Sequence, residues 1–548
     1  KHCLFSGSIY SSNTNFSWET VDGVELGGLC GSIRQKAAAV IDDSYVSGLV
    51  SSAFNKYSGA VVGLIYTDGT VVATNTYTST VVAGKGAIGD GSSHATSGPI
   101  TMNISEMTGI KAYQWTTLDF ENYWAAVEDS TPVLKYFAGP GLSLTGIEKE
   151  YDISWYKEEE ETFTISNLRE MYGFALLSQE NNFKDKTIRL GNDIVVNEGK
   201  ALEWAEGKNF PIMPWFVVGS QGMPFAGTFD GQGHTISGVY YKAFTDCAGV
   251  FASAAYGSTI QNLKVKNCFI DASGDKERRY VGGVIGATKG NLDTIYSDSI
   301  VHCDGYETGG IVGYVNYHDP ALETVQKINN CWFNGRVAGG SLRRAGGVIG
   351  TVTYQTGGLD CHTEISNCLN TGTVISERIN SSDGFGGMYA GGLIGYVWGG
   401  FQLDVRDCLN VGSIAVQYNT YVGSFIGYGS GNTKITMENC YTTKESYQNQ
   451  GASVAHGGFS KANRTGDVTI MPESILIGAN AYKYTMLDFS KYWGLVENDT
   501  PVLQPGGRET PRETPPAAER AAARRIAPPP EQDGVAHALM ELGLIHTF

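Results

Sequence analysis

The stretch from Gly282 to Thr443 repeats one pattern, in which a glycine-bounded aliphatic block alternates with an Asn-Cys or Asp-Cys pair. The glycine blocks are GGVIG from residue 282, GGIVG from 309, GGVIG from 346, GGLIG from 391 and VGSFIG ending at Gly427. The pairs are Asn267-Cys268, Asn330-Cys331, Asn367-Cys368, Asp407-Cys408 and Asn439-Cys440. A unit this short cannot bury its own apolar face, so we expect the copies to stack as a solenoid.

The residue types inside each repeat indicate the kind of solenoid. Short β-favouring runs such as Val284-Ile285 and Leu393-Ile394 are bounded by glycine and lack a helical period. The Asn before each Cys favours a left-handed corner, and Gly335, Gly372 and Gly412 provide a second bend. The prediction is therefore an all-β, right-handed parallel β-helix, continuous over residues 246–480, with the aliphatic side chains of the glycine blocks inside.

These repeats resemble a known family. GGLIG at 391–395 and SNCLNTGTV at 366–374 are similar to the GLUG repeat of large bacterial surface and adhesin-like proteins, also found in non-catalytic regions of some secreted peptidases. The resemblance covers nearly the whole chain up to about residue 504. It implies a β-helical stalk or presenting module and says little about activity.

An internal duplication predicts two consecutive solenoid modules. The segments LDF, YW, VE and TPVL of residues 118–134 return at a constant offset in residues 487–503, and we interpret each block as a C-terminal cap. The predicted segments are 1–137, the end of a first module with its cap; 138–160, a linker; 161–245, the N-terminal cap and opening coils of a second module; 246–504, the GLUG-type β-helix with its cap; and 505–548, a tail.

Two further segments differ from the repeats. Residues 166–177 (SNLREMYGFALL) predict a short capping helix that begins at Ser166 or Asn167 and plugs the second module. Residues 505–548 are rich in Pro, Ala, Arg and Glu and lack the composition of a coil. We interpret them as a linker or as sequence foreign to the natural protein.

Composition limits the classes of partner. The net charge of −17 argues against generic binding to nucleic acid or anionic lipid, which needs a basic patch. No apolar run is long enough for a transmembrane helix, so no membrane insertion is expected. The chain begins inside a repeat, and we expect a secreted or cell-surface protein whose signal and anchor lie outside this sequence.

The cysteines are predicted to be structural. Cys268, Cys331, Cys368, Cys408 and Cys440 are expected in one column of buried, reduced thiols, because parallel Cβ vectors suit a disulfide poorly. Ser297, Ser44 and Thr76 stand where other copies carry Cys, as expected for a position that needs a small side chain. Disulfides remain the alternative. No zinc-type Cys or His spacing occurs, so no metal and no cofactor are predicted.

Catalytic motifs are weak in this sequence. DGQGH at 230–234 matches part of a polysaccharide-hydrolase site, but a tight turn in which Asp and Gly supply unusual backbone angles is the better explanation. Glycosidases need two carboxyls about 5 to 10 Å apart, and no second motif with paired Asp is visible. We therefore predict no catalytic residues and no enzyme, and keep a β-helical polysaccharide lyase or glycoside hydrolase as the alternative.

Aromatic residues near coil ends give the binding hypothesis. Tyr rings stack on sugar faces and anchor protein partners. The predicted function is an extracellular structural and adhesive rod of a bacterial surface protein, which presents loops to a host or bacterial surface glycan or protein. The candidate ligand-binding residues are Tyr280, Tyr306, Tyr314, Tyr317, Tyr389 and Trp398.

Overall fold

The structure is a computed structural model. It describes residues 1–11, 25–34, 36–52, 57–79, 87–91, 95–242, 247–273, 280–304, 307–316, 325–339, 344–354, 361–376, 389–416, 421–446, 448–449, 452–453, 455–460 and 462–504. The chain forms two compact units: Lys1–Lys186 with Phe216–Phe225 and Phe244–Asp246, and Thr187–Trp215 with Ala226–Ala243 and Cys247–Phe548. Within the described residues, no helix is long and apolar enough to cross a bilayer.

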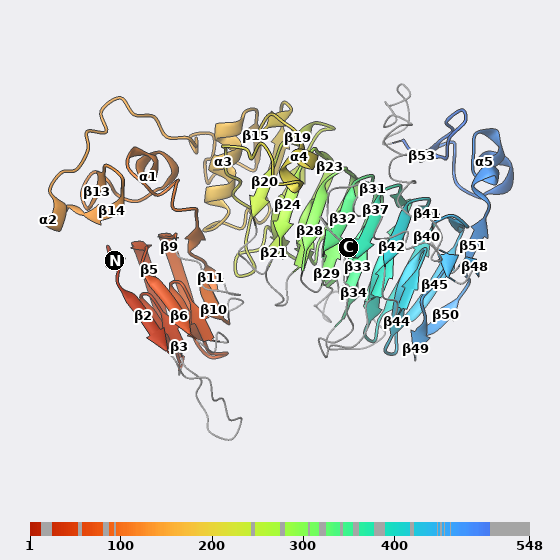
Figure 1. Cartoon of the computed structure of the whole chain (residues 1–548), viewed down its shortest axis with the longest axis horizontal. Coiled ribbons are helices and arrows are strands. Elements are labelled where there is room, and N and C mark those ends of the chain that lie inside the picture. Colours follow the sequence, from red (N-terminus) through yellow and green to blue (C-terminus); the bar gives the residue numbers. More distant parts are fainter. Residues whose placement is uncertain are drawn as a thin grey trace, which may run out of the picture. The chain divides into compact units, whose positions relative to one another are not determined.

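The second unit is a stack of coils whose strands pair in parallel with the same strands of neighbouring coils (Figure 1). Its longest sheet, here called the bent sheet, turns at a corner inside each coil. Before the corner it contains β16 (Thr187–Leu190), β18 (Thr228–Asp230), β35 (His362–Ser366), β40 (Gln402–Arg406), β45 (Lys434–Glu438) and β50 (Asn463–Thr465). After the corner it contains β17 (Ile194–Val195), β19 (Thr235–Ser237), β36 (Leu369–Asn370), β41 (Leu409–Asn410), β46 (Cys440–Thr443) and β51 (Val468–Met471). Both parts are continuous in β23 (Thr259–Lys266), β27 (Asn291–Ser297) and β31 (Gln326–Phe333).

Three further parallel sheets complete the coils. The second sheet is β20 (Tyr240–Lys242), β24 (Phe269–Ala272), β28 (Ile300–Cys303), β32 (Arg336–Gly339), β37 (Thr373–Ser376) and β42 (Ser413–Val416). The third is β21 (Cys247–Ala248), β25 (Tyr280–Gly282), β29 (Glu307–Gly309), β33 (Arg344–Gly346), β38 (Tyr389–Gly391) and β43 (Tyr421–Gly423). The fourth is β22 (Phe251–Ala254), β26 (Ile285–Thr288), β30 (Val312–Asn316), β34 (Ile349–Thr353), β39 (Ile394–Trp398), β44 (Ile426–Ser430) and β49 (Phe459–Ser460).

The glycine blocks make the bend between the third and fourth sheets. Their aliphatic side chains, including Val284, Ile311 and Leu393, are fully buried. A Cβ on Gly310 would clash with the carbonyl oxygen of Gly347 in the next coil, so glycine is needed for this close approach. The predicted parallel β-helix, with the aliphatics inside, is confirmed.

Left-handed residues form the corner of the bent sheet. The corner residues Asn262, Thr294, Asn330, Asn367, Asp407 and Asn439 have φ between 50° and 58°. The residue after each corner points into the core and pairs with its counterparts in neighbouring coils: Leu263, Ile295, Cys331, Cys368, Cys408 and Cys440. Asn and Asp tolerate this backbone region better than other non-glycine residues.

The predicted places of Cys268 and Ser297 in this column are wrong. Cys268 follows a different left-handed residue, Asn267, and directly precedes β24 of the second sheet. Ser297 pairs with Phe333, two residues beyond Cys331. The Asn-Cys string recurs at two corners because both have a left-handed residue followed by a buried side chain. All five thiols are buried, which confirms that part of the prediction, and none forms a disulfide in this structure. That they stay reduced is still a prediction.

The first unit contains shorter coils of the same type. Its parallel pairs are β1 (Leu4–Phe5), β5 (Ala38–Val46), β9 (Thr70–Thr78), β11 (Ala95–Ser97) and β12 (Ile100–Thr101); β4 (Cys30–Ile33), β8 (Val62–Ile65) and β10 (Ile88–Asp90); β2 (Ser8–Ser11) with β6 (Leu49–Ser52); and β3 (Glu25–Gly27) with β7 (Tyr57–Gly59). Ser44 and Thr76 pair with each other after the left-handed Asp43 and Asn75. They occupy the cysteine position, as predicted.

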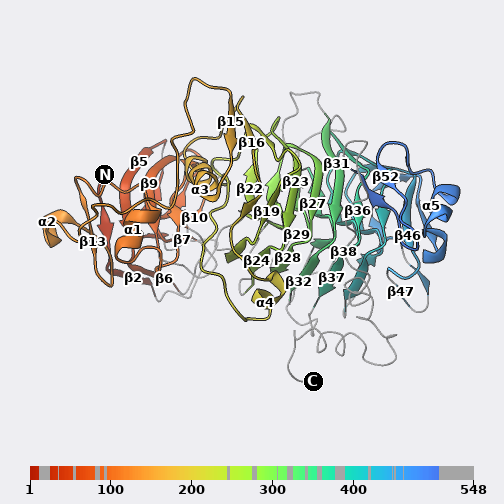
Figure 2. The same ribbon diagram turned by 90° about the horizontal axis from the view of Figure 1, so that it is seen from above.

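The duplicated blocks fold alike. In the first unit α1 (Ile110–Trp115) precedes the antiparallel hairpin β13 (Trp124–Val127) and β14 (Ser130–Leu134), followed by α2 (Lys135–Ala138). In the second unit η2 (Glu473–Ile475) and α5 (Ala479–Tyr484) precede the hairpin β52 (Trp493–Gly494) and β53 (Val502–Leu503). Figure 2 shows β52 and α5 of the second block beside the last coils of the second unit. This block packs across the side of four coils, against an apolar row formed by Trp332, Leu369, Leu409 and Tyr441. It therefore covers an outward-facing row as well as following the last coil.

The predicted helix over 166–177 is confirmed as α3 (Leu168–Leu177). Asn167 is its N-cap, and its side chain accepts a hydrogen bond from the Glu170 backbone N–H. This helix belongs to the first unit, where Tyr172 makes an edge contact with Trp115. From the sequence, this helix was assigned to the second module as its plug. In the structure the first compact unit extends to Lys186 and includes the helix. The shorter elements are β15 (Thr162–Ile165) and α4 (Ala201–Ala205). The tail 505–548 lies outside the described residues, and the predicted segment boundaries stay predictions.

Candidate functional site

Two outward-facing ladders flank the glycine blocks of the second unit. On the third sheet, the residues in register are Tyr280, Glu307, Arg344, Tyr389 and Tyr421. On the fourth sheet, they are Ala287, Tyr314, Thr351, Tyr396 and Tyr428. Parallel pairing repeats an outward position once per coil, about 4.8 Å apart, so rings at these positions meet face to face.

Four of these tyrosines form an aromatic ridge, defined as Tyr389, Tyr396, Tyr421 and Tyr428. The ring centroids of Tyr389 and Tyr396 are 4.7 Å apart and those of Tyr421 and Tyr428 are 4.2 Å apart. Tyr389 also stacks on Tyr428 at 5.1 Å. Because the rings stack on one another, much of their surface area is covered by neighbouring rings and is not open to a ligand. The ridge therefore adds side-chain contacts between neighbouring coils along this edge of the second unit.

An ion pair between a buried carboxylate and a partly exposed arginine joins the ridge to the preceding coils. Glu307 is fully buried, and Arg344 donates a hydrogen bond from Nη1 to its Oε1 at 2.5 Å. The Arg344 guanidinium also lies 4.6 Å from the centroid of the Tyr396 ring. On the other side of the pair, Tyr280 stacks on Tyr314 at 4.2 Å. A buried carboxylate is tolerated when a hydrogen-bonded cation faces it, and this ladder provides one.

The candidate binding residues have different surroundings. Tyr280 and Tyr389 are half-buried in the stacks, Tyr314 is buried, and Trp398 is 42% exposed. Tyr306 and Tyr317 lie outside the described residues. Of these candidates, Trp398 therefore has the most accessible ring, and the ligand-binding role of all six stays a prediction.

Sequence reasoning missed Tyr421 and Tyr428, and it left Tyr396 out of the binding set. The sequence did contain a signal, in YAGGLIGY at 389–396 and YVGSFIGY at 421–428. In both segments one tyrosine stands two residues before the first glycine of the block, and a second tyrosine directly follows the last glycine. Both flanking positions become neighbours only once the bend is formed.

A second candidate feature is a charge cluster on the bent sheet, before its corner. Asp404 Oδ2 lies 3.1 Å from both His362 Nε2 and Arg406 Nη2. Arg406 Nη1 lies 2.5 Å from Glu438 Oε2. Glu364 pairs with Asp404 across neighbouring strands. Carboxylates and basic groups thus lie together on one sheet face, an arrangement that a polysaccharide-acting enzyme on a β-helix would need.

Two carboxyls of this region titrate in opposite directions. Burial alone would raise the pKa of Asp404, but hydrogen bonds from Arg406 and Thr436 lower it below its ordinary value. Burial raises the pKa of Asp407, against the hydrogen bond from Asn439, and the charge of Glu438 adds to the increase. Carboxyls with separated pKa values are a pattern found in acid–base catalysis, although ion-pair networks produce it too.

The segment 230–234 holds a turn in the structure. The Asp230 carboxylate accepts hydrogen bonds from the backbone and side chain of Gln232 and from the side chains of Gln261 and Asn262. Burial opposes ionisation of Asp230, but these hydrogen bonds lower its pKa. His234 instead faces Asp193, with 3.0 Å between Nδ1 and Oδ1. Asp230 therefore holds neighbouring turns together. Within the described ranges, no cluster of His, Cys, Asp and Glu has the arrangement of a metal site.

Comparison with known proteins gives limited similarity. No family model matches the chain. Halomucin from Haloquadratum walsbyi is 25% identical over 171 residues, which are 31% of this chain and 2% of Halomucin. The chain thus spans a very small part of this relative.

A crystal structure of a Bacteroides ovatus protein, provisionally named immunoglobulin A1 protease, is also similar. The similarity covers 65% of this chain and 96% of that protein, with 17% identity and a TM-score of 0.43. These values are too low to support an argument about activity.

Proposed function

We propose that this chain is a structural and adhesive rod of an extracellular bacterial surface protein that binds a host or cell-surface glycan or protein. The supporting observation is that equivalent strands of neighbouring coils keep the same pairing register, whereas the segments that connect the strands differ in length. β42 and β43 are joined by residues 417–420, whereas β37 and β38 are joined by residues 377–388. A scaffold that keeps its core while its connections change length suits the presentation of binding loops.

Packing supports the rod role. The inward residues of each coil, such as Ile349 and Ile394, are fully buried against their counterparts in neighbouring coils. Each such side chain contributes about 1.5 to 3 kcal/mol when it is removed from water. The aromatic ridge and the Glu307–Arg344 pair add cross-coil contacts on the outer edge.

An array of glycans and host proteins tests this function with the full chain as the probe. We expect saturable binding to a restricted set of ligands, and weaker binding of Trp398→Ala, which removes an exposed ring. Tyr123→Ala, which changes a partly exposed ring in the first unit, is the matched control. No binding to any glycan or host protein on the array contradicts the adhesive role.

The charge cluster favours a second candidate, a polysaccharide-acting enzyme on the bent sheet. In this alternative Asp407, with its raised pKa, is the proton donor, and Asp404 is the ionised partner. Incubation with polyuronates and neutral polysaccharides, followed by mass analysis of the products, tests it. Cleavage that is lost in both Asp404→Asn and Asp407→Asn supports the enzyme. Intact polymers after incubation favour the rod.

A further inference from the structure

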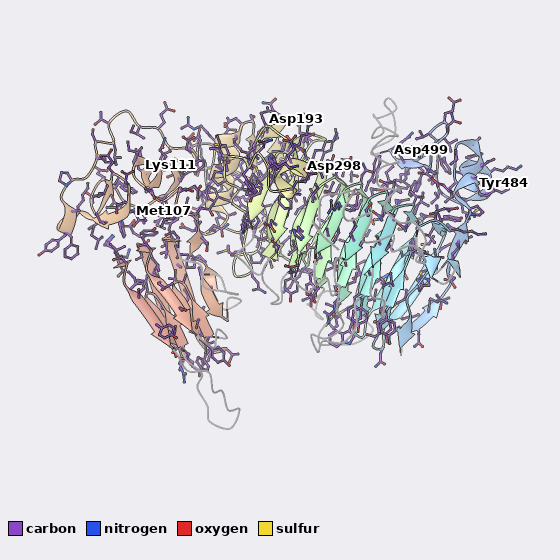
Figure 3. All side chains as sticks on the ribbon, in the orientation of Figure 1. Met107, Lys111, Asp193, Asp298, Tyr484 and Asp499 are labelled. Carbon is purple, nitrogen blue, oxygen red and sulfur yellow. The ribbon has the colours of Figure 1, made fainter. Side chains whose placement is uncertain are left out.

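A groove separates the C-terminal cap from the corner of the bent sheet. Its volume is about 710 Å³, in the range of pockets for small ligands, about 300 to 1,000 Å³. One wall is the cap, with Lys491, Tyr492, Leu503 and Gln504. The other residues come from successive coils of the second unit. Figure 3 shows Asp298, which follows β27, and Asp499 of the cap along the same edge of this unit.

The floor of the groove presents polar side chains once per coil. Asn262, Thr294 and Asn330 are left-handed corner residues that line it. Asp293 Oδ1 accepts hydrogen bonds from Asn330 Nδ2 at 2.7 Å and from Thr294 Oγ1 at 3.2 Å. Asn330 Oδ1 is buried and has no hydrogen-bond partner in the part of the chain that the structure describes. A buried acceptor without a donor costs about 1 to 3 kcal/mol.

The walls combine aromatic rings with positive charge. Tyr296 and Trp332 meet edge to face with centroids 5.1 Å apart, and Tyr492 lies in the cap. Lys264 and Lys491 line the groove together with one carboxylate, Asp293. Aromatic rings contact the apolar faces of sugars, amides and carboxylates bind their hydroxyls, and ammonium groups attract acidic substituents.

We propose that this groove binds an oligosaccharide that contains acidic sugars. The inference rests on the proposed adhesive function and names a ligand class and a site for it. Two lysines against one carboxylate favour a uronate over a neutral sugar. The repeated corner side chains match a polymer that presents hydroxyls along its length. This site differs from the aromatic ridge, which lies on the third and fourth sheets.

Titration calorimetry of the full chain tests the site. The probe is a hexasaccharide of alternating glucuronate and N-acetylglucosamine, and the neutral control is a hexamer of N-acetylglucosamine. We expect the acidic hexasaccharide to bind at least about tenfold more tightly than the neutral hexamer. A tenfold difference in Kd corresponds to about 1.4 kcal/mol of binding free energy. Equal binding of the neutral hexamer, or of a hexaglutamate peptide, overturns the proposal.

Charge reversal locates the site. The double variant Lys264→Glu with Lys491→Glu should weaken binding of the acidic hexasaccharide about tenfold or more. The double variant Lys434→Glu with Lys483→Glu changes net charge equally outside the groove lining and should stay within about twofold of the unmodified chain. Circular dichroism confirms folding of both variants.

The outcomes separate this inference from the proposed function. Unchanged binding in the groove variant, or equal weakening in both double variants, overturns the groove as the site. Neither result bears on array ligands that bind elsewhere. The adhesive role fails only if the array finds no glycan or protein ligand at all.

Discussion

The two duplicated caps have the same backbone but different polar contacts. Both helices begin after a glycine of nearly identical conformation, Gly109 at φ 62° and Gly478 at φ 57°. Both end at a threonine whose Oγ1 donates to the carbonyl oxygen four residues earlier at 2.7 Å, Thr116 and Thr485. The shared geometry shows that the cap is one folding motif used twice, and that its contacts with the coils vary independently.

The caps also attach to the coils at equivalent places. The Thr117 backbone N–H donates to Tyr77 Oη at 2.9 Å, and the Met486 backbone N–H donates to Tyr441 Oη at 2.8 Å. Tyr77 and Tyr441 each lie two residues after a left-handed Asn. The corner residue of the preceding coil is Asp43 in the first unit and Asp407 in the second. Asp43 and Asp407 are therefore equivalent.

The difference lies in what these two aspartates bind. Asp43 accepts hydrogen bonds from Trp124 Nε1 and the Asp119 backbone N–H, both at 2.8 Å. Trp493 is also fully buried, but its Nε1 has no partner among the described residues. Asp407 instead accepts from Asn439 Nδ2 at 2.9 Å. The first cap is thus fastened by a polar network, whereas the second is held mainly by apolar packing against four coils.

Truncation of the cap tryptophans should have the largest effect. Trp493→Ala should lower the free energy of unfolding of its unit by about 3 to 5 kcal/mol, because it removes a fully buried aromatic side chain. Trp124→Ala should cost more, because it also removes a donor from the buried Asp43. Denaturant titration monitored by hydrogen exchange in each cap measures both. A smaller loss for Trp124→Ala would show that the polar network contributes little.

Substitution by phenylalanine separates the hydrogen bond from the packing. Trp124→Phe should destabilise the first unit by about 1.5 to 3 kcal/mol, the range for hydrogen bonds to charged groups. Trp493→Phe loses no hydrogen bond and should lose only part of its packing, less than about 1.5 kcal/mol. The same exchange experiment serves as the readout. Equal losses in the two caps would contradict the assignment of the difference to Asp43.

The two aspartates should respond to Asp→Asn with opposite signs. Asp43→Asn should destabilise the first unit at pH 7 by about 1 kcal/mol, because an amide is a weaker acceptor for the Trp124 N–H. Asp407→Asn should stabilise the second unit by about 0.5 kcal/mol, because it removes a partly buried charge while keeping a residue that favours the left-handed corner.

The pH dependence gives the sign of the Asp407 effect. The folded unit raises the pKa of this carboxyl, so its stabilising contribution is complete below the unfolded pKa, about 3.9, and is lost as pH rises through the folded pKa. The benefit of Asp407→Asn should therefore be present at pH 7 and vanish near about pH 3. Thermal unfolding of both proteins across this range measures it. A benefit that is independent of pH would contradict the charge explanation.

The last prediction concerns the corner residue of the first unit that lies one coil further back, His2. His2 stacks on Tyr123 with ring centroids 3.6 Å apart, and its Nδ1 lies 2.8 Å from Asp43 Oδ2. His2→Ala should destabilise the first cap by about 0.5 to 1.5 kcal/mol, the range for an aromatic pair. The equivalent corner residue of the second unit is Asn367, and Asn367→Ser serves as a control without a ring. Hydrogen exchange in the first cap measures the effect, and an unchanged exchange rate would show that the stack is not stabilising.

Several features of this protein were determined by the sequence alone. Repeated glycine blocks and Asn-Cys pairs predicted stacked coils, because glycine fits the close approaches between coils and Asn or Asp favours the left-handed corners. The duplicated LDF and TPVL segments predicted two similar caps, and the Ser166-Asn167 pair predicted the start of α3. Each of these depends on local backbone chemistry, which a short sequence pattern records.

The register between coils was decided by the tertiary structure. Cys268 and Cys331 share the same local string, yet they stand at different corners, since pairing depends on the length of the whole coil. The aromatic ridge, the Glu307–Arg344 pair and the groove beside Tyr492 join residues from separate coils. Their geometry follows from parallel pairing about 4.8 Å apart and from the cap folding across the side of the stack, and no local pattern encodes either distance.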